Sequence, residues 1–146
     1  MGGSITDTTL RELTGKGFAD LKAEGDSTSD ILNMLLYMEA TTMLAISSLV
    51  KKLTRDYPAL TFAHGQTAHW SSTEHTVWYT TDEPHADWVL LHETAHGLLR
   101  HANYAYDIEL VRFEKDAWQY AVQTLAPRYN LVIDPDFIEA HLDTYR

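Results

Sequence analysis

The sequence predicts an α+β fold, because the period of its apolar residues changes twice along the chain. Helical spacing over about residues 30–56 is followed by short segments rich in threonine, valine and aromatic residues, and helical spacing returns after residue 81. This order predicts a small antiparallel or mixed sheet packed on helices. The 146 residues suffice for one domain with a sizeable core, and the absence of cysteine excludes disulfides and thiolate metal sites.

The amino-terminal part divides into a polar segment and a long helix. Residues 1–28 mix glycine, threonine and charge, which predicts a flexible or partly helical segment before a single domain over residues 29–146. The motif "STSD" supplies N-cap residues for a helix from about Asp30 to Asp56, which Pro58 ends. The expected core-packing face of this helix comprises Ile31, Leu35, Met38, Ala45 and Leu49.

Strands are expected next. The segments "ALTFAHG", "QTAHWSS" and "HTVWYTT" are short, rich in threonine, valine and aromatic residues, and separated by Gly65 and by Ser71–Glu74. They predict two or three short antiparallel strands.

Helical spacing then resumes. "TDEP" (Thr81–Pro84) predicts the start of a helix that ends near His101. A last long helix is expected over Tyr106–Leu125, stopped by Pro127, with a short helix after Pro135.

Composition limits the possible partners. The 11 basic and 21 acidic residues give a formal charge of -10, which repels a nucleic acid backbone. The longest apolar stretches, such as Met43–Val50, are broken by serine or threonine and fall short of a bilayer-spanning length. The first twenty residues lack the apolar core of a secretory signal. We therefore expect no nucleic-acid or membrane partner and a cytoplasmic location.

Two histidines in "LLHETAHGLLRH" (Leu90–His101) predict a metal site. Residues four apart differ by about 40° around a helix, so His92 and His96 can bind one ion. Glu93 is turned by about 100° from His92, beside the place of a metal-bound water whose proton it would take. This is the His-Glu-x-x-His pattern. The alternative is a surface histidine pair with a solvated glutamate, or histidines that bind no metal.

A catalytic zinc site uses three protein ligands and leaves a position for water. His101 lies about 140° round the helix from His96, which indicates a polar helix end. Glu114 lies within the apolar face of the last helix, whereas Glu109 and Asp116 project on its far side. A carboxylate in an apolar face is costly unless a cation satisfies it. Glu114 is therefore the predicted third ligand; a carboxylate snorkelling from the edge of this face is the alternative, and Asp116 or Glu109 could substitute for it.

The segments "VWYTTDEPHADWVLLHETAHGLLRH" and "EKDAWQYAVQTLAP" resemble the ImmA/IrrE-type metallopeptidases, compact members of the gluzincin group. The family pattern follows the His-Glu-x-x-His helix with Glu-x-x-Ala-Asn/Asp-x-Phe-Ala and a proline. The corresponding positions hold Glu114, Ala117, Tyr120, Ala121 and Pro127. The resemblance covers about residues 57–127, close to half the chain, and implies a compact zincin-like domain.

The resemblance also implies a set of roles. Zinc would bind His92, His96 and Glu114, and Glu93 would act as general base and proton carrier. The strand around Thr76–Thr80 would be an edge strand that pairs with an extended peptide. The function implied is a zinc-dependent metalloendopeptidase acting on a protein or peptide, in this family typically a transcriptional repressor.

Two positions depart from the family pattern, and the first of them favours a second hypothesis, together with the acidic charge and the long amino-terminal helix. Trp118 stands where an Asn or Asp would steady a histidine ligand, and the turn reads Leu-Ala-Pro in place of Leu-Met-Pro. The alternative function is a catalytically weak or inactive metal-binding module that interacts with a protein partner. For the peptidase, His101, Tyr104 and Tyr106 are candidate oxyanion donors.

Overall fold

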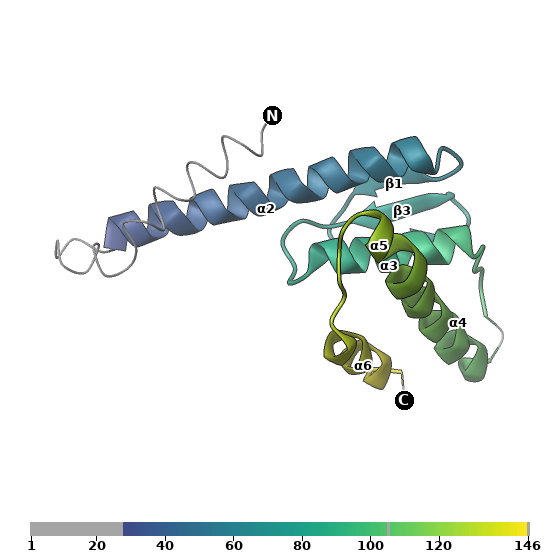
Figure 1. Ribbon diagram of the computed structural model, residues 1–146. Helices are drawn as coiled ribbons and strands as arrows, with labels where there is room; N and C mark the ends of the chain where they lie inside the picture. Colours follow the sequence, from purple (N-terminus) through teal and green to yellow (C-terminus); the bar gives the residue numbers. More distant parts are fainter. Residues whose placement is uncertain (1–27, 105, 146) are drawn as a thin grey trace. The chain divides into compact units, whose positions relative to one another are not determined.

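The computed structural model describes residues 28–104 and 106–145. Contacts divide the chain into two compact units between Ala45 and Ile46, and the second unit holds the sheet and all the helices after α2 (Figure 1). The predicted amino-terminal segment lies outside the described residues apart from Thr28. Its predicted boundary at residue 28 stays a prediction.

Helix α2 (Thr28–Asp56) ends at the residue that Pro58 predicts, but its described residues are already helical from Thr28, two residues before the predicted start at Asp30. Its last turns, in the second unit, bury Ile46, Leu49 and Leu53 in the main core. The predicted core-packing face is wrong in the first unit, where Leu35 is 54% exposed and Met38 is 48% exposed. This half of the helix carries its own apolar residues on all sides, so their spacing does not single out one buried face.

The composition of α2 also bears on the expected absence of a membrane partner. The helix is long and apolar enough to cross a membrane, with a mean hydropathy of 1.2 over its most apolar stretch, of which 11% is buried. Signal sequences and the core helices of soluble proteins meet the same criterion. The absence of a membrane partner therefore stays a prediction.

The sheet is mixed and has three strands in the order β1-β3-β2. Strand β1 (Thr61–His64) runs parallel to β3 (Thr76–Tyr79), and β2 (His69–Ser71) runs antiparallel to it. Of the antiparallel and mixed sheets that the sequence allows, the structure has the mixed one. The antiparallel pairing expected of the strand segments is wrong for β1, because the chain passes from β1 to the far side of β3 before it turns back. The edge strand expected around Thr76–Thr80 is also wrong, since β3 is central and the edges are β1 and β2.

Helix α3 (Ala86–Leu98) packs on β2 and β3 and carries the histidine pair (Figure 1). It begins later than the start predicted within Thr81–Pro84. The Thr80 hydroxyl donates to the Glu83 carboxylate at 2.7 Å, and His85 takes a left-handed conformation with φ 54°. This bend delays the helix to Ala86.

Helix α4 (Asp107–Tyr120) continues through a π-helical segment, η1 (Ala121–Leu125), into the short α5 (Ala126–Arg128). Pro127 therefore does not stop the helix where predicted. It lies in α5, directly after the π-helical segment, and the helix continues past it to Arg128.

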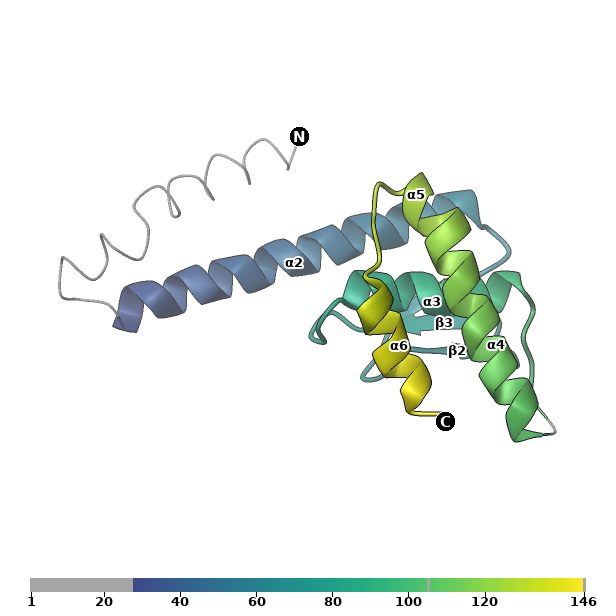
Figure 2. The ribbon, with the colours of Figure 1, turned by 60° about the horizontal axis from the view of Figure 1, so that its bottom comes forward.

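The predicted short helix α6 (Pro135–Asp143) is capped by the Asp134 side chain, which accepts from the backbone N–H of Asp136 at 2.9 Å. It lies beside α4, with which it is in contact (Figures 1 and 2). The core between sheet and helices includes Leu53, Leu90, Leu91 and Leu125, each 0% exposed. The fold is thus α+β, as the sequence predicts.

Candidate metal centre

Three side chains from α3 and α4 converge in the second unit. Nε2 of His92 lies 2.8 Å from Oε2 of Glu114, and Nε2 of His96 lies 3.1 Å from Oε1 of the same carboxylate. The two Nε2 atoms are 3.2 Å apart. The structure thus forms a His-His-Glu group that could hold a metal ion.

The spacing of these atoms suits a small cation. Tetrahedral bonds of about 2.0–2.1 Å separate the ligand atoms by about 3.3 Å. The two Nε2 atoms are 3.2 Å apart, and each has one of the Glu114 oxygens within 3.1 Å. His92, His96 and Glu114 are 4%, 7% and 9% exposed, so the protein shields this side of the site from water. Two imidazoles and a carboxylate suit zinc, and also other divalent transition metals.

The protonation of the group also suits a cation. Burial lowers the pKa of His92 to about 4, although its hydrogen bond to Glu114 opposes the shift. Burial acts to raise the pKa of Glu114, but the hydrogen bonds from His92 and His96 outweigh it and lower that pKa to about 2. A neutral imidazole and an ionised carboxylate are the forms that bind metal.

Glu93 lies beside this group without belonging to it. Its Oε2 is 3.8 Å from Nε2 of His92, and its side chain is 14% exposed. Burial, with a smaller contribution from the charge of Glu114, raises the pKa of Glu93 to about 8. A carboxyl group whose pKa lies near neutrality can both accept and release a proton.

Two cavities, of about 360 and 300 Å³, open beside the group. Both are lined by Glu93, Glu114, Ala68 and Tyr145. The first also reaches His92, and the second reaches His96. A substrate in either cavity would therefore lie against the candidate general base.

Trp118 contacts His92 in a way that the sequence did not predict. The two rings stack with their centroids 4.0 Å apart and an interplanar angle of 17°. Among the described residues, neither Nδ1 of His92 nor Nε1 of Trp118 has a hydrogen-bond partner. Trp118 thus constrains the His92 ring by packing, without the hydrogen bond that an Asn or Asp would make.

The other predicted candidates fall into different places. Glu109 and Asp116 do not belong to the His-His-Glu group, and Asp116 is exposed. Of the candidate oxyanion donors, Tyr104 lines the 300 Å³ cavity, whereas Tyr106 is 70% exposed and lines neither cavity. His101 is more than a polar helix end, because its Nδ1 lies 2.9 Å from Nδ1 of His96.

The sequence did not point to two further residues at this site. Tyr145 follows α6 and lines both cavities, and the neighbouring carboxylates Glu114 and Glu93 add to the burial that raises its pKa. No local sequence pattern marks Tyr145, because only the packing of α6 brings it near the two cavities. Trp70 on β2 lines the 300 Å³ cavity, and the alternation of the short strand was its only sequence signal.

No family model, curated protein or solved structure matches the chain. The resemblance to the ImmA/IrrE-type peptidases therefore stays a prediction from the motifs, and the function of the site has to be inferred from its geometry.

Proposed function

We propose that this protein is a zinc-dependent metalloendopeptidase with His92, His96 and Glu114 as metal ligands and Glu93 as general base. The observation that carries the proposal is the convergence of two Nε2 atoms and one carboxylate within 4.8 Å of one another. A buried carboxyl group with a raised pKa stands next to them. Three protein ligands and an adjacent carboxylate are the parts that a hydrolytic zinc site requires.

Each residue has a defined task in this proposal. When bound, zinc would lower the pKa of a water molecule and polarise the peptide carbonyl. Glu93 would accept the proton of that water and pass it to the leaving amine, and a pKa near neutrality suits both transfers. Tyr145 and Tyr104 line the cavities and are the tyrosines placed to donate a hydrogen bond to the substrate.

The edge strand β2 supports a peptide as the substrate. Within residues 28–104 and 106–145, strand β2 pairs on one side only, with β3. Its residues His69 and Trp70 line the 300 Å³ cavity beside His96. An extended chain could add to this edge by backbone hydrogen bonds and place a peptide bond against Glu93. The proposed substrate is therefore an extended protein segment, of which a transcriptional repressor is the kind that the resemblance implies.

The test compares metal content and hydrolysis in matched variants. Wild-type protein should carry about one zinc per chain by elemental analysis and should cleave an unfolded protein such as casein, and a chelator should abolish cleavage. Glu93→Gln should retain zinc without cleaving, while Glu114→Ala should lose both. Full cleavage by Glu93→Gln would refute the role of Glu93, and no zinc uptake by the wild type would refute the site.

The second candidate function is a metal-binding interaction module without turnover. It is favoured by Nδ1 of His92, which has no hydrogen-bond partner in the part of the chain that the structure describes. Ligand histidines usually donate that proton to an oxygen acceptor, and losing this partner weakens activity. The same experiment separates the two functions. Zinc uptake with no cleavage of any unfolded substrate by the wild type would support the module.

A further inference from the structure

The chain after α3 folds back onto the metal centre. The backbone N–H of His101 donates to the carbonyl of His96 at 3.0 Å, and Arg100 before it takes a left-handed conformation with φ 58°. This turn places the His101 ring over Phe113 of α4, with centroids 4.2 Å apart and planes 12° from parallel. Its Nδ1 then lies 2.9 Å from Nδ1 of His96.

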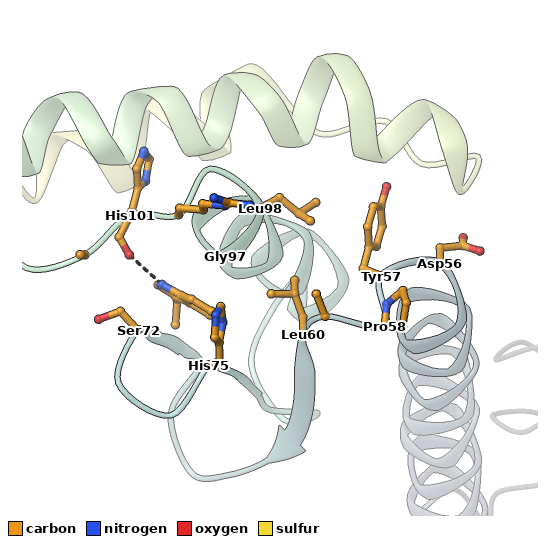
Figure 3. A pocket seen from close by; sticks show the side chains of 13 residues that line it. Asp56, Tyr57, Pro58, Leu60, Ser72, His75, Gly97, Leu98 and His101 are labelled. Carbon is orange, nitrogen blue, oxygen red and sulfur yellow. Dashed lines mark hydrogen bonds between the residues drawn. The ribbon is translucent and has the colours of Figure 1, made fainter.

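A second contact holds His101 from the side of the sheet. Nε1 of Trp70 donates to the backbone carbonyl of His101 at 2.9 Å, the hydrogen bond drawn at His101 in Figure 3. This bond borders a separate cavity of about 600 Å³ that none of the three ligands lines. Trp70 packs so closely on α3 that a Cβ at Gly97 would come 3.0 Å from its ring. The backbone and the ring of His101 are therefore both constrained.

We infer that His101 is a positioning residue that orients His96 for metal binding, an inference that rests on the metal site proposed above. A neutral imidazole that binds an ion through Nε2 carries its proton on Nδ1. The Nδ1–H of His96 then needs an acceptor, and Nδ1 of His101 lies at hydrogen-bond distance from it. Accepting this bond requires that His101 carry its own proton on Nε2.

The two histidine ligands are thus held by different means. His92 is stacked on Trp118 and makes no hydrogen bond through Nδ1 to any described residue. His96 has its Nδ1 contact with His101. Removing the acceptor at position 101 should therefore release His96 and leave the stacking of His92 intact.

The test measures zinc affinity by competition with a chromophoric chelator. His101→Phe keeps an aromatic ring for Phe113 but removes the acceptor, and it should weaken zinc binding by about 10–100-fold. His101→Asn should stay within about threefold of the wild type, because its side-chain oxygen can accept the bond in place of Nδ1. His64→Phe is the matched control, since His64 lies on β1 and lines neither cavity beside the ligands. Equal affinities of His101→Phe and wild type would overturn the inference.

A spectroscopic measurement on the wild type keeps the inference testable if His101→Phe does not fold. In ¹⁵N spectra of the zinc-loaded protein, His96 should carry its proton on Nδ1 and His101 should carry its proton on Nε2. A proton on Nδ1 of His101 would overturn the inference. If the wild type binds one zinc per chain and His101→Phe binds it equally well, the proposed function stands and only the role of His101 is overturned. No zinc uptake by the wild type would overturn both the proposed function and this inference.

Discussion

Replacing Glu93 by glutamine is expected to stabilise the metal-free protein at neutral and alkaline pH. The carboxyl group of Glu93 is 14% exposed, and burial raises its pKa from 4.5 to about 8. Ionising this group in the folded protein is costly, whereas it ionises freely in the unfolded chain. Glutamine has nearly the same shape and carries no charge, so it avoids this cost.

The size and sign of the effect follow from the shift. The rise from 4.5 to about 8, at about 1.36 kcal/mol for each pKa unit, sets a ceiling of about 5 kcal/mol on the cost. The Trp70 backbone hydrogen-bonds the Glu93 carboxyl group and acts to lower its pKa. Relaxation of the site and the change of this bond in glutamine reduce the gain, and we expect about 2 kcal/mol. Because the folded-state pKa of Glu93 is raised, its carboxyl group does not destabilise the wild type below pH 4.5. The destabilisation grows as the pH rises from 4.5 to about 8.

Denaturant unfolding with a metal chelator present, from pH 4 to pH 9, measures this difference. The free energy of unfolding of Glu93→Gln should exceed that of the wild type by an amount that increases with pH. Glu74→Gln, at an exposed glutamate in the turn between β2 and β3, is the matched control and should show no such trend. A difference between Glu93→Gln and wild type that stays constant with pH would refute the reasoning.

Three further predictions concern other parts of the domain. Glu114→Ala should weaken zinc binding by more than about 100-fold, because removing a metal ligand lowers the affinity more than removing a hydrogen-bond partner of a ligand. Competition with a chelator measures the affinity, and an unchanged affinity would point to another third ligand. The pKa of Asp56 is lowered from 3.8 to about 2, and the hydrogen bond from the Arg55 side chain is the largest cause. The stability from this carboxylate should be complete above pH 3.8 and be lost as the pH falls towards 2, so the acid unfolding curve of Asp56→Asn should lack that component. Gly97→Ala should cost about 1–3 kcal/mol in denaturant unfolding, because the added Cβ would lie 3.0 Å from the Trp70 ring; a neutral effect would show that Trp70 is free to shift.

The sequence by itself determined the features that repeat within one helix. The spacing of His92 and His96 places them on one face of any helix that includes both, and Glu114 shares the apolar face of its helix through the same periodicity. The end of α2 and the start of α6 were similarly accessible, because prolines and capping residues act on their immediate neighbours.

The tertiary structure decided how these elements meet. No local pattern reveals that β1 pairs parallel to β3, which makes β2 the edge strand beside the candidate metal ligands. The contact between His101 and His96 depends on a left-handed turn at Arg100 and on a hydrogen bond from distant Trp70. Local propensity acts over a few residues, whereas the buried surfaces that bring distant side chains within 3 Å or so are set by the packing of the whole domain.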